Sequence, residues 1–289
     1  MKTTPIIAIV GPTGIGKTKL GVSLAKFLDG EVISVDSLQV YRDGGIMTAK
    51  PTLEEMDGIK HHLIDYLDAN EEPSSFVELS VQTIRLCQTR RKVPILVGGS
   101  MSLTRPLLFH PFFTRQELSV IILDSDIGIL GSRLDARVEQ MAGQGLLQEA
   151  QYLHDLEREL LKDGDFSTGI WKAIGYPELR PCFGVDHDSV EYHHLVTKGL
   201  ALMKTNTRLY AAAQLAWIRT SLIPAFQERG VDYTVFNVGA TPTAQQKVDT
   251  PRSKLILYPY FVLLGGTVAS SMYMMGRLVL GHKTWFGKG

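Results

Sequence analysis

Residues 5–18 read PIIAIVGPTGIGKT, an apolar run that leads into a glycine-rich turn. The spacing G-x-x-x-x-G-K-T predicts a buried strand, a phosphate-binding loop and then a helix. Glycine lets backbone N–H groups turn inward around phosphate oxygens, and the helix directs its positive end at the same anion. The loop residues expected to contact the phosphates are Gly11, Thr13, Gly14, Gly16, Lys17 and Thr18. The sequence therefore predicts a site for a di- or triphosphate.

Two side chains of this loop carry specific chemistry. Lys17 adds a point charge beside the phosphates, and the Thr18 hydroxyl is placed to ligate Mg²⁺. A chance glycine-rich turn is the alternative. It is disfavoured because the following helix has Leu20 and Leu24 on one face, in agreement with the strand and the spacing. The motif does not specify which phosphorylated ligand binds.

Length and composition narrow the class of protein. The chain has 289 residues, enough for one large or two modest domains. Thirty basic residues balance thirty acidic ones, so a nucleic-acid partner would have to be recognised through a local patch. Cys87 and Cys182 form no C-x-x-C pair, and we expect both to be reduced, mostly buried thiols of an intracellular protein.

Polar residues follow the next predicted strand, at 32–35. Asp36 comes directly after it, with Ser37 and Gln39 on the same loop. Functional groups gather at the carboxyl ends of strands in open parallel sheets, beside the phosphate loop. Asp36 is therefore a candidate for acid–base work or for holding a metal-bound water. A solvated turn aspartate is the alternative, and both stay open.

A third buried run, 94–97, ends in Gly98, Gly99 and Ser100. A P-loop ATPase often has a carboxylate at this kind of strand end. Two glycines and a hydroxyl indicate instead a backbone that approaches a ligand, with Ser100 donating a hydrogen bond. This pattern weakens the ATPase interpretation.

A fourth predicted strand, 118–123, ends in Asp124 and leads to an amphipathic helix. That helix carries Arg133 and Arg137 four residues apart, on one face. If this face meets the phosphate loop, two guanidinium groups would clamp a leaving pyrophosphate. A solvated basic stripe is the alternative.

The adjacent histidine pair at 61–62 (HH) points to opposite faces of an extended chain, so we expect structural histidines.

The rest of the chain completes the expected architecture. A long helix is predicted from 189 to 222 and is expected to end at Pro224, and a last strand is predicted at 231–238. We expect an α/β fold of the P-loop NTPase-like three-layer type, with a parallel sheet and a helical C-terminal half. This domain would occupy residues 1–240, followed by a linker at 241–254.

The tail, 255–289, opens with 22 uncharged residues, 255–276. That length can span a bilayer core, and Tyr258, Tyr260 and Trp285 sit where interface aromatics belong. A buried strand–helix pair is the alternative. We favour one C-terminal transmembrane helix, because uncharged runs of this length are uncommon in soluble folds.

The motifs together resemble one family, the dimethylallyl (isopentenyl) transferases that prenylate the exocyclic amine of adenine. The matching blocks, in the family's order, are GPTGIGKT, DSLQVY, TAKPT, HHLID, PILVGGS, RLDARVEQM, GIWKAIGYPEL and TRLYAAAQLAWIR. They cover about residues 5 to 240. DSLQVY and TAKPT look more like the tRNA-modifying branch than the branch that prenylates free adenine nucleotides.

The resemblance implies roles for particular residues. The loop would hold the pyrophosphate of dimethylallyl diphosphate with Mg²⁺, and Lys17, Thr18 and Arg137 would stabilise it as it leaves. Asp36 would be the general base that takes a proton from N6 of adenine, with Ser100 hydrogen-bonding nearby. These roles fit the physical chemistry, because charge builds on the leaving group and on the amine. The substrate-binding residues would be Ser37, Gln39, Lys172 and Arg208.

Three departures from the tRNA branch concern the acceptor. That branch has a helical insertion that grips the anticodon arm, whereas here only seventeen residues separate Ser100 from Leu118. The range 211–214 reads AAAQ in place of a basic A-K-R-Q, which should weaken phosphate-backbone contacts. The zinc-finger extension common in the eukaryotic tRNA enzymes is also missing, and with Cys87 and Cys182 as the two cysteines we expect no such finger. The missing insertion favours the free-nucleotide branch.

Residues 250–289 resemble a small mitochondrial inner-membrane protein, fungal subunit VII of cytochrome c oxidase. A fusion that anchors the enzyme and a merger of two neighbouring genes are both compatible with this. The expected location is mitochondrial or cytoplasmic, and the mitochondrial inner membrane if the tail is genuine.

The leading hypothesis is a tRNA dimethylallyltransferase whose partner is the tRNA anticodon arm. An adenylate dimethylallyltransferase acting on AMP, ADP or ATP is the first alternative. A P-loop NTPase or kinase would need Asp36 or Asp124 as its metal-binding carboxylate. A membrane-anchored respiratory subunit with a degenerate enzyme domain is the non-enzymatic alternative.

Overall fold

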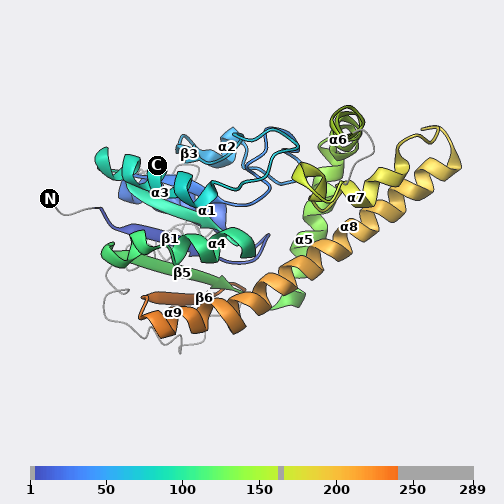
Figure 1. Ribbon diagram of the computed structural model, residues 1–289. Helices are drawn as coiled ribbons and strands as arrows, with labels where there is room; N and C mark the ends of the chain where they lie inside the picture. The colour runs from blue at the N-terminus through green and yellow to red at the C-terminus, as the bar shows by residue number, and fades with distance from the viewer. Residues whose placement is uncertain (1–3, 162–165, 240–289) are drawn as a thin grey trace, which may run out of the picture. The chain divides into compact units, whose positions relative to one another are not determined.

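A parallel sheet lies at the centre of the fold. The computed structural model describes residues 4–161 and 166–239. Among these, six strands form one sheet in the order β3-β2-β4-β1-β5-β6 (Figure 1), and every neighbouring pair is parallel. The strands are β1 (Ile6–Val10), β2 (Gly30–Val35), β3 (His61–His62), β4 (Val93–Gly98), β5 (Leu118–Asp124) and β6 (Tyr233–Asn237). The predicted α/β class with a parallel sheet is confirmed.

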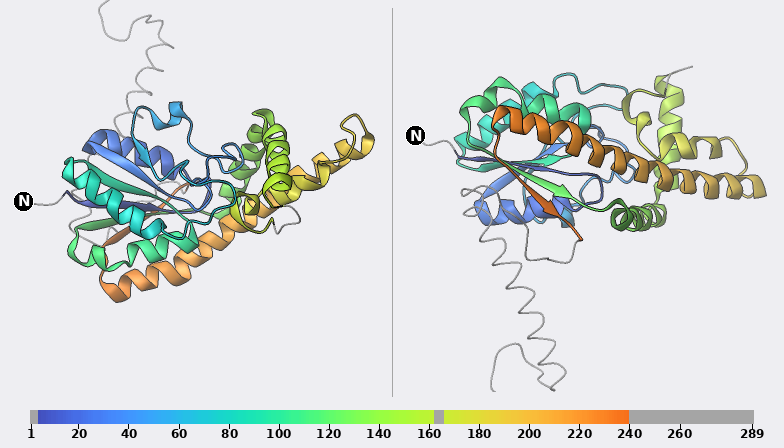
Figure 2. Two further views of the ribbon diagram at one scale, coloured as in Figure 1. Left: turned by 45° about the horizontal axis from the view of Figure 1, so that its top comes forward. Right: turned by 90° about the horizontal axis from the view of Figure 1, so that it is seen from below.

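Helices cover both faces of this sheet. They are α1 (Lys17–Leu28), α2 (Leu53–Met56), α3 (Phe76–Thr89), α4 (Met101–Leu108), α5 (Ile127–Gly143), α6 (Leu146–Leu160), α7 (Tyr176–Leu179), α8 (Val190–Trp217) and α9 (Ile223–Arg229). Helix α1 packs on one face, and α3, α4 and α9 lie on the other (Figure 2, right). Every residue of β1, β2 and β4 is buried, as expected for strands covered on both sides.

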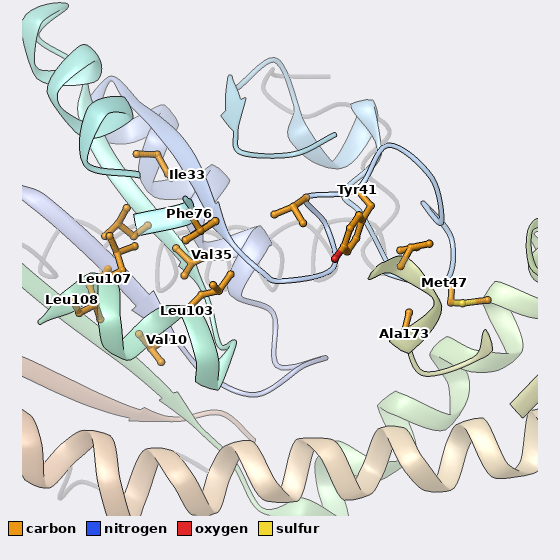
Figure 3. Close-up of a cluster of buried hydrophobic side chains, with 14 of the residues drawn as sticks. Val10, Ile33, Val35, Tyr41, Met47, Phe76, Leu103, Leu107, Leu108 and Ala173 are labelled. Carbon is orange, nitrogen blue, oxygen red and sulfur yellow. The ribbon is translucent and has the colours of Figure 1, made fainter. Parts of the chain in front are cut away.

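The core extends from the sheet to the loops at its carboxyl edge. Val10 and Val35 face Leu107 of α4 near the strand ends, and the same apolar cluster continues to Tyr41 and Met47 (Figure 3). Tyr41 is fully buried, and its hydroxyl donates to the Glu71 carbonyl at 3.0 Å. The loop after β2 is thereby fixed against the core, which holds the start of that loop, Asp36, in place.

The helical half has its own packing centre, in which α5, α6, α7 and α8 meet. Trp171 is fully buried there, and its indole N–H donates to the Leu153 carbonyl at 2.8 Å. Glu157 is also buried and receives the Arg180 guanidinium at 2.8 and 2.9 Å. A buried carboxylate with a bidentate partner is satisfied, so this cluster fixes α6 against the segment that follows it.

The expected helix end at Pro224 is wrong. Helix α8 continues through one π-helical turn, Ile218–Leu222, and Pro224 lies in the first turn of α9. In the π turn, the Ile223 N–H bonds the Ile218 carbonyl five residues back. Widening the helix by one residue accommodates a proline that has no N–H to donate, so the chain continues without a break.

Two predictions fall on residues that the structure does not describe. The linker at 241–254 and the tail at 255–289 both lie outside the described residues. Within the described ranges, none of the helices combines the length and apolar character needed to cross a bilayer.

Candidate active site

The predicted phosphate-binding loop connects β1 to α1. Gly16 adopts φ 101° just before α1 begins at Lys17, a conformation that side chains other than glycine rarely adopt. The end of β4 approaches this loop so closely that a Cβ atom on Gly99 would lie 2.1 Å from the Gly11 carbonyl oxygen. The glycines of both motifs therefore allow two backbone segments to pack against each other beside the phosphate position.

Lys17 is buried inside this loop. Its Nζ donates to the Pro12 carbonyl at 2.8 Å. Burial lowers the pKa of Lys17 to about 8, opposed by the Asp36 carboxylate and reinforced by the Arg137 guanidinium. A buried ammonium of this kind is poised to gain a negative ligand, which would restore its ordinary pKa.

Two cavities meet at the carboxyl edge of the sheet. The first, the loop cavity, has a volume of about 330 Å³ and is lined by the phosphate loop, the end of β2 and α5. The second, the α8 cavity, has a volume of about 380 Å³ and is lined in part by α8. Both are lined by Thr13, Lys17, Asp36, Thr48, Ala49 and Arg137. A ligand in one cavity would therefore meet a ligand in the other at these six residues.

The two cavities differ in chemistry. The loop cavity has many polar side chains, among them Thr18 and Arg133. The α8 cavity has a large apolar share, contributed by Leu38, Met47, Leu134, Val138, Met141, Ile174 and Met203. Polar groups suit a diphosphate, and apolar walls with a few polar groups suit a flat base or a prenyl chain.

Asp36 stands between these cavities. Its Oδ1 atom accepts the Leu38 backbone N–H at 2.9 Å and the Gln39 N–H at 3.4 Å. This turn fixes the carboxylate at the end of β2. Gln39 has its own amide engaged, since its Oε1 accepts from Ser34 at 2.9 Å and its Nε2 donates to Ala49 at 3.2 Å. Gln39 therefore shapes the wall of the loop cavity.

The two arginines of α5 both reach the loop cavity. Arg137 is half-buried and lies between the cavities, with its guanidinium 3.4 Å from the Thr13 hydroxyl and 3.5 Å from the Ala49 carbonyl. Burial lowers the pKa of Arg137. Arg133 is exposed at the outer rim. Both contacts of Arg137 are long, so its guanidinium is available to an anion.

The other predicted site residues are placed differently. Ser37 and Lys172 line the α8 cavity, where Lys172 also pairs with Glu72 at 2.7 Å. Ser100 is 4 % exposed at the start of α4, with its hydroxyl 3.1 Å from that of Ser102. Arg208 donates to both Asp135 oxygens at 2.6 Å. Among the described residues, Ser100 and Arg208 are outside both cavity walls.

Sequence reasoning missed two residues of α8. Tyr210 lines the α8 cavity, and burial together with the charge of Asp36 raises the pKa of Tyr210 to about 12. Gln214 lines the same cavity and contacts the phosphate loop. Their spacing of four residues places both on one helix face. This spacing is the feature of the sequence that could have grouped them.

The two histidines of the adjacent pair have different surroundings. His61 lines the loop cavity, whereas His62 bonds Glu31 at 2.6 Å beside the buried free thiol of Cys87. The ligand atoms of Glu31, His62 and Cys87 lie within 4.8 Å of one another. Arg90 also donates to the same Glu31 oxygen, at 2.6 Å. The Glu31 carboxylate is therefore already shared by His62 and Arg90.

Asp124 does not serve the phosphate loop. It receives the Arg219 guanidinium at 2.7 Å and, within the described residues, is outside both cavity walls. The NTPase alternative therefore loses one of its two candidate carboxylates.

A phosphate-binding loop whose cavity adjoins a second, largely apolar cavity suits a P-loop enzyme that transfers a group from a phosphorylated donor. Comparison with known proteins identifies the family: the chain belongs to the IPP transferase family, whose family model matches residues 39–118 and 110–221. It is thus a prenyl transferase. A second family model, cytochrome c oxidase subunit VII, matches residues 248–281, which lie outside the described residues.

Two of the similar proteins carry names that state different activities. A bifunctional cytokinin biosynthesis protein from Fusarium pseudograminearum is 47% identical over 220 residues, covering 76% of this chain and 45% of that protein. The chain thus spans about half of the length of this relative. A tRNA dimethylallyltransferase from Exiguobacterium is 31% identical, covering 76% of this chain and 88% of that protein.

Solved structures agree with the family. A tRNA isopentenylpyrophosphate transferase from Bacillus halodurans has a TM-score of 0.67 and 28% identity, covering 94% of this chain and 99% of that chain. A eukaryotic dimethylallyltransferase acting on tRNA has a TM-score of 0.70 and 25% identity, covering 91% of this chain and 80% of that chain.

Proposed function

We propose that the chain transfers a dimethylallyl group from dimethylallyl diphosphate to the N6 amine of adenine beside the anticodon of tRNA. The observation that carries this is the shared wall of the two cavities, where Lys17 and Arg137 face Asp36. Cations on one side and a carboxylate on the other suit a reaction in which a diphosphate leaves while an amine loses a proton.

The donor would place its diphosphate in the loop cavity. Backbone N–H groups of the loop, Lys17 and Arg137 would bind the phosphate oxygens, with the positive end of α1 behind them. Thr18 and Asp36 offer oxygen ligands on the same cavity, which is the ligand type that Mg²⁺ prefers. Thr18 would hold Mg²⁺ with the phosphates, and the ion would supply charge neutralisation for the leaving group.

The acceptor would enter through the α8 cavity. Its apolar side chains suit the faces of a purine, and Asp36 lies where the purine meets the donor. The bond from N6 to the allylic carbon forms as the bond from that carbon to the diphosphate oxygen breaks. The N6 proton passes to the Asp36 carboxylate, and the electron pair of the broken bond leaves with pyrophosphate.

A free adenine nucleotide is the second candidate acceptor. The seventeen residues between Ser100 and Leu118 form α4 and a short 3₁₀ turn, Pro111–Arg115, with Leu107 and Phe113 buried in the core. This connection contains no separate helical module for an anticodon arm. The similarity to the fungal cytokinin protein supports the same alternative.

The acceptor can be decided directly. The full chain would be incubated with Mg²⁺ and labelled dimethylallyl diphosphate, and offered an anticodon stem-loop with adenine beside the anticodon in parallel with AMP, ADP and ATP. Label on the RNA supports the tRNA function, and label on a nucleotide supports the second candidate. Absence of label in every arm, with the donor still bound, contradicts both.

For the tail, we propose a membrane anchor at 255–276, which the family match at 248–281 supports. Amplification of one transcript across the codons for residues 240–250, together with mitochondrial membrane fractionation of the product, would support the fused chain. Separate transcripts would instead indicate merged genes and remove the anchor.

A further inference from the structure

The amide of Gln214 bridges two distant backbone segments. Gln214 is 3 % exposed on α8. Its Oε1 accepts the Thr13 backbone N–H at 2.9 Å, and its Nε2 donates to the Gly99 carbonyl at 2.8 Å. A side-chain amide offers an acceptor and a donor at these two positions whatever the pH. The phosphate loop and the end of β4 are therefore joined through one side chain of α8.

The peptide group between Pro12 and Thr13 is held at both ends. Its carbonyl oxygen accepts from the Lys17 ammonium at 2.8 Å, and its N–H donates to Gln214 at 2.9 Å. A trans peptide is planar, with its C=O and N–H directed oppositely. Holding the N–H therefore also fixes the direction of the carbonyl, and with it the position of the Lys17 ammonium that donates to it.

The same amide connects the loop to the wall of the second cavity. Met203, Thr207 and Tyr210 line the α8 cavity from the helix that carries Gln214. Helix α8 runs continuously from the helical half toward the sheet (Figure 1). A shift of this wall relative to the phosphate loop would have to break one of the two amide hydrogen bonds.

We propose that Gln214 is a positioning residue, which holds the Pro12–Thr13 peptide and Lys17 in the conformation that a diphosphate needs and ties that conformation to α8. Its relevance to prenyl transfer rests on the proposed function. Its effect on diphosphate binding does not, because any diphosphate would contact the same loop.

Two variants test this inference in the full chain. Gln214→Met keeps the length of the side chain and removes both hydrogen bonds. Leaving a buried N–H and a buried carbonyl unpaired should weaken diphosphate binding by about tenfold to a hundredfold. Gln214→Glu is expected to lose the bond to Gly99 when ionised, because two acceptors then face each other. Its protonated form donates to Gly99 while accepting from Thr13, and so restores both bonds.

The readout is the dissociation constant of inorganic pyrophosphate and of dimethylallyl diphosphate with Mg²⁺, by calorimetry from pH 5.5 to 8. We expect the ratio of the Gln214→Glu constant to the wild-type constant to fall toward one on acidification, while the Gln214→Met ratio stays high. A purely structural loss would not be rescued by protonation. If Gln214→Met does not fold, the pH response of Gln214→Glu decides alone.

Constants within about twofold of wild type in a folded Gln214→Met, or a Gln214→Glu ratio that does not change with pH, would overturn the assignment. If the Gln214 variants bind pyrophosphate more weakly but the wild type transfers no prenyl group, the positioning role holds and the proposed function is rejected.

Discussion

The ammonium group of Lys17 should make donor binding depend on pH in a range where few other groups titrate. Burial lowers the pKa of Lys17 from 10.5 to about 8, so keeping this ammonium charged in the loop costs about 3 kcal/mol. A bound diphosphate removes this disadvantage and raises the pKa. Binding therefore requires a protonated Lys17, which the empty protein loses as the pH rises through about 8.

The magnitude follows from the fraction of protonated Lys17. At pH 7 nearly all of the empty protein carries the proton, whereas at pH 9 about one tenth does. The dissociation constant of dimethylallyl diphosphate should thus be nearly constant up to pH 7.5, rise about twofold at pH 8 and rise about tenfold at pH 9. Calorimetry in two buffers of different ionisation enthalpy should show uptake of about half a proton at pH 8 and nearly one at pH 9.

Lys17→Arg is the matched control, because its guanidinium stays charged throughout this range. Measurements without acceptor, from pH 7.5 to 9.5 and with Mg²⁺ present, avoid turnover and keep the donor ionised. An affinity that stays constant in the wild type would refute the lowered pKa. An equal loss in Lys17→Arg would assign the titration to another group.

Three further predictions concern single residues. Asp36→Asn should leave donor binding nearly unchanged and lower the transfer rate by about 10²–10⁴-fold; unchanged turnover would remove Asp36 as the base. Arg137→Ala should lower the rate constant of a single turnover by about 10²–10³-fold, and the exposed Arg133→Ala by less than tenfold or so; equal effects would contradict the distinction. Trp171→Phe should lower the unfolding free energy by about 1–3 kcal/mol, because it leaves a small cavity and removes the indole hydrogen bond to the Leu153 carbonyl, and a thermal midpoint equal to wild type would contradict this.

The local parts of the site could be predicted from the sequence because they depend on neighbouring residues. The phosphate loop is encoded by glycine spacing and an apolar run, and Asp36 by its place after a buried strand. Arg133 and Arg137 could be grouped by helical spacing, but not placed. In the structure both line the loop cavity. Their placement there depends on how α5 packs, and nothing in the neighbouring sequence indicates it.

The parts that could not be predicted depend on contacts between distant residues. Gln214 and Thr13 lie 201 positions apart, so the bond between them follows from the fold alone. The pairing of Arg208 with Asp135, across 73 positions, is equally invisible in the sequence. At Pro224 the local rule failed, because a π turn upstream removed the conflict that normally ends a helix.

The outward face of α8 can change without altering the inward face that lines the site. Its inward face carries Tyr210 and Gln214, which line the α8 cavity. Ala213 is exposed, in the stretch where the tRNA-modifying relatives are expected to carry basic residues. Loss of cations there weakens contacts to a phosphate backbone without altering the wall that faces Asp36. If the chain still modifies RNA, its affinity should therefore depend less steeply on salt than that of a relative with the basic residues, while donor binding stays intact.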